Sequence, residues 1–278
     1  MPERVLVITG TSSGIGLATA VAAARHGFVT VATMRDPSRA GRLLEAAGAA
    51  GVTVDVRQLD VTDPASVSTC IGGVVADHGR IDAVVNNAGT GHLGTIESET
   101  VDDVRRVMEV NFFGVVAVTK AAMPHLRASG GRLVTVSSVG GAIGQPFNEA
   151  YCAAKFAVEG FMESLVPVAA SVGVTVVVVE PGAVASDFVA NVDVDPADVF
   201  AGAGPYEAAL RAYIDEVMSH FGSAQHPDEA ADAIVAALTG PHPAPRIQTS
   251  TWAADFVGTK LADLDGTTVT AMTGAWLG

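Results

Sequence analysis

The sequence is that of an acidic, apolar protein of 278 residues, 49% hydrophobic and 17% charged, which is ample for a folded core and too apolar for disorder. A formal net charge of −14 argues against binding to nucleic acid or to an anionic membrane, because both need a basic surface. No apolar run approaches the ~20 residues that a membrane-spanning helix needs, and residues 1–4 leave no room for a signal peptide. We therefore expect a cytoplasmic protein without a membrane span, in which Cys70 and Cys152 stay reduced.

Short apolar runs alternate with longer Ala-rich stretches along most of the chain. The apolar runs predict strands at 4–9, 28–33, 52–59, 81–85, 132–137 and 174–179. The stretches between them predict helices at 14–26, 37–48, 64–78, 100–129 and 149–172. This alternation predicts an α/β fold with a parallel sheet covered by helices on both faces. Since no low-complexity linker or internal repeat interrupts it, we expect one domain over residues 1–278.

The alternation stops after Gly182. Residues 183–226 are predicted to be an irregular insertion over the carboxyl end of the sheet, where such folds bind ligands. Gly202 and Gly204 are candidate hinges for a closing lid. The remaining predicted elements are an amphipathic helix at 206–221, a helix at 226–238, a strand near 246–249 and a Gly- and Thr-rich tail.

A glycine-rich segment, TGTSSGIG at 9–16, follows the first strand directly and opens the first helix. In this setting glycines permit a tight turn and let a pyrophosphate approach the backbone N–H groups of the helix N-terminus. The segment lacks the Gly-Lys-Ser/Thr ending of a P-loop, which argues against nucleoside triphosphate hydrolysis. We predict that a dinucleotide contacts Gly10, Ser12, Ser13, Gly14, Ile15 and Gly16.

The end of the second strand should contact the adenosine ribose of this cofactor. An acid there would bind the 2′-hydroxyl of NAD, whereas an arginine would bind the 2′-phosphate of NADP. Asp36 is the candidate acid, but the Asp-Pro pairs at Asp36, Asp63 and Asp195 are typical of helix N-caps. Arg35, assisted by Arg39, is the candidate phosphate ligand, the alternative being a solvated charge. We predict NADP(H) as the preferred cofactor, with NAD(H) as the alternative.

The segment from Ser138 to Lys155 places a hydroxyl, a phenol and an ammonium within reach of one reacting oxygen. Tyr151 and Lys155 are four residues apart, so on a helix they share one face. A nearby cation favours the phenolate, and lowering the pKa of the phenol from ~10 by about 3 units would need roughly 4 kcal/mol. Tyr151 would then exchange a proton with a carbonyl or alcohol oxygen.

Several motifs occur together in one order, namely TGTSSGIG at 9–16, Asn86-Asn87-Ala88-Gly89, Asn111, Ser138, YCAAK at 151–155 and Pro181-Gly182. This combination resembles the short-chain dehydrogenase/reductase family across essentially the whole chain. The resemblance implies a Rossmann-type doubly wound sheet of about seven strands. It also implies hydride transfer between a nicotinamide cofactor and an alcohol or ketone.

The resemblance implies roles for individual residues as well. Ser138 would hydrogen-bond the substrate oxygen, and Tyr151 would be the acid/base. Lys155 would bind the nicotinamide ribose and lower the pKa of the phenol, and Asn111 would hold a water that links Lys155 to bulk solvent. Asn86 would bond neighbouring backbone. Further cofactor contacts are implied at the adenine by Asp60 and Val61, at the adenosine ribose by Asn87, Ala88 and Gly89, and at the carboxamide by Pro181, Gly182, Val184 and Ser186.

Residues 32–47, 137–165 and the tail from 226 resemble more narrowly the 17-beta-hydroxysteroid and retinol dehydrogenase branch, which usually prefers NADP(H). We therefore expect a hydrophobic, steroid- or retinoid-like ketone or alcohol as substrate. The likeness is weak in 187–222, and two alternatives stay open. One is a broad carbonyl reductase or polyketide-type ketoreductase, and the other is a non-catalytic cofactor-binding regulator. The resemblance also implies a homodimer or homotetramer formed through the long helices.

Apolar side chains in and near the insertion have two interpretations, because they either line a substrate pocket or pack the loop itself. They are Phe147, Phe188, Val189, Phe200, Tyr206 and Phe221. His92 is expected to be a satisfied or surface histidine rather than part of the pocket rim. His220 and His226 lack a local ligand pattern, so we predict no metal site.

Overall fold

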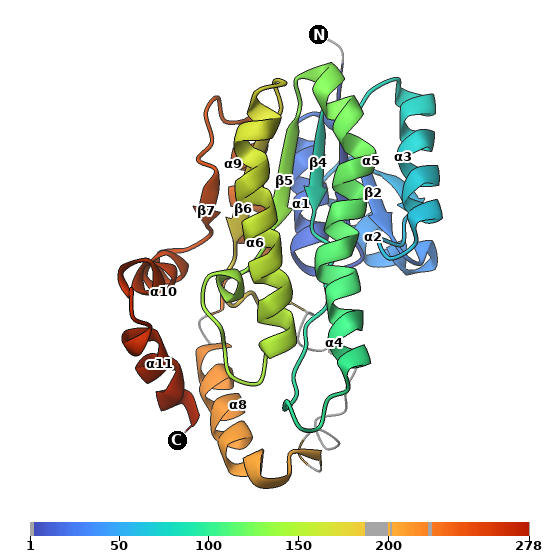
Figure 1. The fold of residues 1–278 in the computed structure, drawn as a ribbon. Coiled ribbons are helices and arrows are strands. Elements are labelled where there is room, and N and C mark those ends of the chain that lie inside the picture. The colour runs from blue at the N-terminus through green and yellow to red at the C-terminus, as the bar shows by residue number, and fades with distance from the viewer. Residues whose placement is uncertain (1–2, 187–199, 201, 222–223, 278) are drawn as a thin grey trace.

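The structure is a computed structural model that describes residues 3–186, 200, 202–221 and 224–277, the side chains of 219–221 excepted. Figure 1 shows the course of the chain. The predicted cap at Asp195 and the side chains of Phe188, Val189, His220 and Phe221 lie outside the described residues.

A seven-stranded sheet runs through the molecule in the order β3-β2-β1-β4-β5-β6-β7 (Figure 1). All neighbouring strands are parallel. The strand order changes direction between β1 and β4, and the carboxyl ends of strands at such a point form the usual ligand-binding edge. The predicted Rossmann-type sheet is therefore confirmed. The strands are β1 Arg4–Thr9, β2 Phe28–Met34, β3 Asp55–Gln58, β4 Ala83–Asn86, β5 Arg132–Val136, β6 Thr175–Glu180 and β7 Arg246–Gln248.

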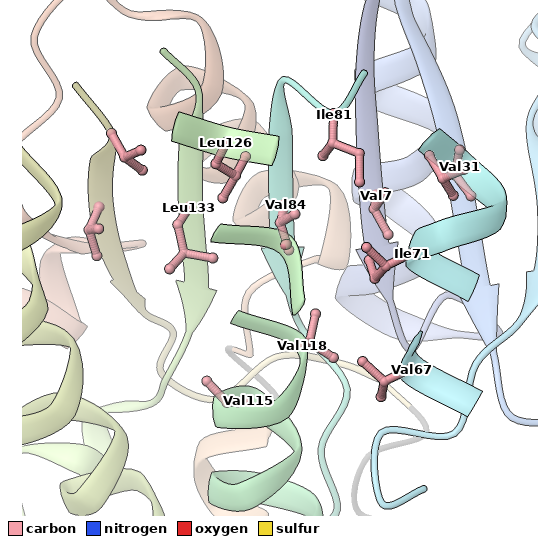
Figure 2. Close-up of a cluster of buried hydrophobic side chains, with 14 of the residues drawn as sticks. Val7, Val31, Val67, Ile71, Ile81, Val84, Val115, Val118, Leu126 and Leu133 are labelled. Atoms are coloured by element: carbon pink, nitrogen blue, oxygen red, sulfur yellow. The ribbon is translucent and has the colours of Figure 1, made fainter. Parts of the chain in front are cut away.

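Successive side chains of the inner strands are buried under opposite layers of helices, because a strand alternates its faces. In β1, Val7 belongs to one core cluster and Leu6 to the other. Figure 2 shows the first cluster, in which Val7 and Val84 of the sheet pack with Leu126. The helices of this layer are α3 Pro64–His78, α5 Gly114–Ser129 and α6 Glu149–Ala170. The opposite layer contains α1 Gly14–Arg25, α2 Gly41–Ala49 and α9 Pro227–Thr239.

The predicted helix at 100–129 is interrupted by a π-helical turn. It consists of α4 (Val101–Met108), the π-helical segment Glu109–Phe113 and α5. By length and composition alone, the 29-residue stretch Val101–Ser129 could cross a membrane, because an 18-residue window within it has a mean hydropathy of 1.2. Val115 and Val118 of this stretch are buried against the sheet, and core helices meet the same criteria. The sequence had predicted no membrane-spanning segment. The length and composition of this stretch are only weak evidence for one.

Two further predicted boundaries shift for local reasons. The helix predicted at 37–48 begins as a 3-10 turn, Pro37–Ala40, which the Asp36 side chain caps by accepting a hydrogen bond from Ser38 N at 3.0 Å. Asp63 caps α3 in the same way, through Ala65 N at 2.9 Å. The strand predicted at 52–59 is confined to β3, at the edge of the sheet.

The tail is helical, which the sequence did not indicate. It forms α10 (Thr251–Ala262), α11 (Thr267–Gly274) and a 3-10 turn at Ala275–Leu277. These elements lie with α8 (Glu207–Phe221) beyond one end of the sheet (Figure 1). Ser250 caps α10 by accepting from Ala253 N at 3.1 Å, so a cap signal was present. The many Gly and Thr residues of the tail, which are weak helix formers, concealed this signal.

Candidate active site

The glycine-rich segment forms a tight turn between β1 and α1. Gly10 has a φ of +72°, and a Cβ at this position would stand 2.7 Å from Ala88 Cα. A Cβ on Gly16 would collide with the carbonyl oxygen of Gly10 and with Asn87 Nδ2. The turn can therefore form in this conformation only with glycine at positions 10 and 16. Without side chains there, its backbone stays accessible to a ligand.

The turn is held by hydrogen bonds between Thr9 and Gly10 and the residues that follow β4. Asn87 Nδ2 donates to Thr9 O at 3.0 Å and to Gly10 O at 2.9 Å, and Ala88 N donates to Thr9 Oγ1 at 3.0 Å. Ser13 at the N-cap of α1 makes no side-chain cap. The first turn of α1 is thus left to a ligand, as a pyrophosphate site requires.

The segment after β6 lies over this turn. A Cβ added to Gly14, whose φ is +57°, would stand 3.2 Å from Ser186 Cβ. Val184 is buried and forms a parallel bridge with Gln225. The residues predicted to hold the two ends of a dinucleotide therefore face one edge of the sheet, and they fit such a group.

Ser138 and Tyr151 meet at the carboxyl end of β5. The Ser138 side chain accepts from Gly140 N at 3.0 Å and hydrogen-bonds the Tyr151 phenol. A Cβ on Gly140 would lie 3.3 Å from Tyr151 Cε1 and 3.4 Å from Ser138 Oγ. Gly140 thus leaves room for this contact, and the sequence did not identify it.

The structure reverses the expected effect on the phenol. Burial raises the pKa of Tyr151 to about 12, although its hydrogen bond with Ser138 opposes the increase. Lys155 Nζ lies 5.7 Å from the centre of the Tyr151 ring and donates to Val136 O at 3.0 Å. Burial lowers the pKa of Lys155 to about 8. Burial therefore places the pKa of Tyr151 above its ordinary value rather than below it, and a lowering of this pKa by Lys155 stays a prediction.

Asn111 lies in the π-helical segment, and its side chain is used for structure. Its Nδ2 donates to Thr90 O at 3.0 Å and to Val107 O at 3.1 Å, and its Oδ1 accepts from Thr90 N at 3.2 Å. A Cβ on Gly89 would stand 2.8 Å from Asn111 Oδ1 and 3.8 Å from Lys155 Nζ. The side chains of Asn111 and Lys155 therefore both lie close to the backbone of Gly89. Both Nδ2 hydrogens of Asn111 are used in its bonds to Thr90 and Val107, so a water held by its side chain would have to donate to Oδ1.

We expect Asn111→Ala to lower the free energy of unfolding by about 2–3 kcal/mol, because it leaves buried backbone groups without partners. Urea unfolding measures the change. The matched control is Asn148→Ala, since the side chain of Asn148 is also hydrogen-bonded but only half-buried. Equal losses in the two variants would contradict a special role for the π-helical turn.

Asp60 and Val61, which are predicted to contact the adenine, also make contacts within the protein. Asp60 Oδ1 accepts from Thr62 N at 2.9 Å and from Thr62 Oγ1 at 2.8 Å, so this carboxylate also shapes its own turn. Val61 packs against the core, where a Cβ on Gly114 would reach it at 2.7 Å. Asn86 donates to Thr119 Oγ1 at 3.0 Å and to Thr135 Oγ1 at 3.3 Å, so its role is structural, but its partners are side-chain hydroxyls rather than the expected neighbouring backbone.

Arg35 is exposed directly after β2. The carboxylate of Asp36 is committed to its cap, and the hydrogen bonds with Ser38 lower the pKa of Asp36. Asp36 therefore acts as the cap that its position indicated. Arg35 and Arg39 are exposed beside this cap, so their charges are accessible to a phosphate group.

Pro181 and Gly182 lead out of β6 under the tail. Pro181 O accepts from Val139 N at 3.0 Å, which ties this segment to the turn after β5. A Cβ on Gly182 would stand 2.9 Å from the Trp252 ring. Trp252 in turn stacks on Phe256 at 5.0 Å, so α10 covers the predicted carboxamide side. No signal in the sequence pointed to Trp252.

For the described members of the apolar set, the structure favours packing. Phe147 is buried and lies 5.7 Å from Tyr213. Phe200 lies under the Arg211 guanidinium at 4.1 Å, and Tyr206 donates to Glu97 at 2.7 Å.

The two histidines His92 and His226 make local hydrogen bonds. His92 Nε2 lies 2.5 Å from Glu99 Oε1 and its side chain is 13% exposed, which confirms a satisfied histidine. His226 caps α9 by accepting from Asp228 N at 3.3 Å. Among the described residues, no group of three or more metal-ligating side chains comes together.

The chain is similar to known oxidoreductases over almost its entire length. The model of the short chain dehydrogenase family matches residues 4–197. Retinol dehydrogenase 8 of Bos taurus is 38% identical over 95% of this chain and 86% of its own. The 17-beta-hydroxysteroid dehydrogenase type 1 of Homo sapiens is 37% identical over 98% of this chain and 85% of its own. A short-chain dehydrogenase from Streptomyces avermitilis is 30% identical, with a TM-score of 0.76 over 99% of this chain and 96% of its own.

Proposed function

The chain belongs to the short-chain dehydrogenase family, whose members are oxidoreductases that act on CH–OH groups, and we propose that it interconverts a hydrophobic ketone and its alcohol with NADP(H). An aldehyde and its primary alcohol would react in the same way. The observation that carries the proposal is the hydrogen-bonded pair Ser138–Tyr151 beside the buried Lys155, at the sheet edge that the glycine turn opens.

In the proposed mechanism the cofactor supplies or accepts the hydride, and the chain handles the charge and the proton. As negative charge builds on the carbonyl oxygen, Ser138 and Tyr151 donate hydrogen bonds to it. Tyr151 gives its phenolic proton to that oxygen, and the positive charge of Lys155 stabilises the phenolate left behind. The raised pKa of Tyr151 keeps the phenol protonated at neutral pH, which is the form that reduction needs.

The apolar tail supports a hydrophobic substrate. Val139 and Ile143, which follow Ser138, pack with Phe256 and Val269 of α10 and α11. Trp276 lies 5.9 Å from Phe256 and 6.3 Å from Tyr213, and so continues the aromatic contact into α8. The curated relatives named as retinol and hydroxysteroid dehydrogenases support a steroid- or retinoid-like substrate class for this chain.

The test is the loss of NADPH absorbance with a panel of ketosteroids, retinal, aromatic ketones and small aliphatic ketones. Turnover confined to ketosteroids or retinal is the expected result. Turnover with small ketones alone would contradict the proposed substrate class but would still support the proposed type of reaction. Cofactor binding without turnover on the entire panel would contradict catalysis.

We expect Arg35→Ala to weaken NADPH binding about 5-fold and to leave NADH binding unchanged, because an exposed charge pair with a phosphate is worth about 1 kcal/mol. Fluorescence titration of both cofactors measures the change. Arg25→Ala at the exposed end of α1 is the control. Equal affinity for the two cofactors, unaffected by Arg35→Ala, would exclude the proposed preference.

We also propose a cytoplasmic homo-oligomer. Apolar side chains stand exposed on the layer that contains α5 and α6, with Phe113 49%, Phe156 39% and Val168 63% exposed. Cys70 and Cys152 are free and buried, as suits a reducing compartment. Light scattering of the purified protein measures the oligomeric state, and a monomer at all concentrations would contradict this proposal.

A further inference from the structure

A buried acidic cluster lies behind Lys155, outside the residues assigned to the reaction. It consists of Ser137, Glu159, Glu180 and Arg246, and we call it the Glu159 cluster. Arg246 Nε lies 3.2 Å from Glu180 Oε1, and Arg246 Nη2 lies 3.5 Å from Glu159 Oε2. The side chain of Glu180 is 0% exposed and that of Glu159 is 8% exposed. One half-buried guanidinium therefore faces two buried carboxyl groups.

The hydrogen bonds of the Glu159 cluster are incomplete. Gln248 Nε2 donates to Glu180 Oε2 at 2.6 Å. Ser137 Oγ, Glu159 Oε1 and Glu180 Oε1 are buried without a well-formed hydrogen bond to any described residue. Buried carboxylates that lack such bonds are costly, so a cluster of this kind calls for an explanation beyond stability.

Geometry links the cluster to Lys155. Glu159 follows Lys155 by one turn of α6, and both are buried on the same face of the helix. Lys155 Nζ donates to Val136 O, and the next residue, Ser137, approaches Glu159. A Cβ on Gly141 would stand 2.7 Å from Ser137 Oγ, 2.9 Å from Glu159 Cγ and 3.1 Å from Lys155 O. Lys155 and Glu159 are therefore held against one short segment of backbone.

Burial and the neighbouring charges shift the pKa values of both Lys155 and Glu159. Burial lowers the pKa of Lys155, and the charge of Glu159 opposes this decrease. Burial and Glu180 raise the pKa of Glu159 to about 7, whereas Ser137 and Arg246 lower it. None of the ion pairs of the described residues includes Lys155. Glu159 is thus the carboxylate whose ionisation Lys155 senses.

We propose that Glu159 is a positioning residue whose buried carboxylate keeps Lys155 protonated, and that Glu180 and Arg246 set how far Glu159 ionises. The inference rests on the proposed function only in so far as the reaction needs a charged Lys155. The neighbouring core positions of α6, such as Val158 and Met162, are apolar, so a buried acid at position 159 is an exception among them.

The test is a titration of the lysine side chains in the cofactor-free protein by ¹³C NMR at the ε-carbon. The sequence contains three lysines, and Lys120 and Lys260 are exposed, so Lys120→Arg and Lys260→Arg assign the signals. We expect Glu159→Gln to lower the pKa of Lys155 by at least about half a unit, because an opposing charge is lost. Glu163→Gln is the matched control, since Glu163 also lies 3.4 Å from Arg246 but its side chain is 76% exposed.

The wild-type protein provides a second measurement that does not depend on folding of the variant. The Lys155 signal should show an additional inflection near neutral pH, where Glu159 ionises, and this inflection should be absent in Glu159→Gln. A wild-type curve with one inflection, or the same pKa of Lys155 with and without Glu159, would overturn the proposal. Both readouts need neither cofactor nor substrate, so they separate this inference from the proposed function.

The pH profile of catalysis then connects the cluster to the reaction. Reduction needs a protonated Tyr151 and a charged Lys155, so the rate should fall as the pH rises through the pKa of Lys155. We expect Glu159→Gln to move this alkaline limb of kcat/KM to lower pH, in step with the NMR titration, and Glu163→Gln to leave it in place. A uniform loss of rate at all pH values would indicate a purely structural role and would count against the proposal.

Discussion

Tyr151→Phe should reduce kcat by roughly 100- to 10,000-fold while NADPH binding changes by less than about 2-fold, because it removes one general acid and leaves the ring in place. The phenol is the proposed proton donor at the carboxyl end of β5, and its hydrogen bond with Ser138 is the contact that the variant loses. Steady-state kinetics with the preferred ketone measures kcat, and fluorescence titration measures cofactor affinity.

Tyr213→Phe is the control for loss of a buried hydroxyl near the site. Tyr213 is buried and accepts a hydrogen bond from Asn148 Nδ2 at 2.9 Å. We expect this variant to lose about 1 kcal/mol of stability and to keep its kcat. If Tyr151→Phe retained activity, or if both variants lost it equally, Tyr151 would be removed from the mechanism.

Gly16→Ala should weaken NADPH binding by about 100-fold and destabilise the protein by about 1–3 kcal/mol. The added methyl group would collide with the carbonyl oxygen of Gly10 and the side-chain amide of Asn87. These two groups cannot move apart without breaking the hydrogen bonds that hold the turn at β4. Urea unfolding and cofactor titration measure the two effects.

Gly72→Ala is the matched control for this substitution. Gly72 lies in the middle of α3, is exposed, and has open space where a Cβ would be placed. There the same methyl group should stabilise the protein by about 0.5–1 kcal/mol, because alanine favours the helix. Normal cofactor affinity in Gly16→Ala would show that the turn does not have to approach a ligand closely.

Sequence reasoning succeeded where the signal was local. Runs of β-branched residues, such as Val176–Val179, predict strands that are buried on both faces, and such strands form parallel sheets. The Asp36 and Asp63 caps depend on residues two positions away, so they could be recognised from the chain alone.

The missed features depend on contacts between distant segments. Trp252 reaches Gly182 only because α10 folds back over β6. The π-helical turn is held by Asn111 through Thr90, which lies 21 residues earlier in the chain.

The sequence alone therefore determined the parallel sheet and the glycine turn and supplied the set of proposed reacting side chains, because periodicity and motif spacing are written along the chain. Only the tertiary structure decided their electrostatics. The pKa of Tyr151 rises rather than falls, and Glu159 approaches Glu180 and Arg246. Desolvation depends on everything packed around a group, and no local pattern reports that packing.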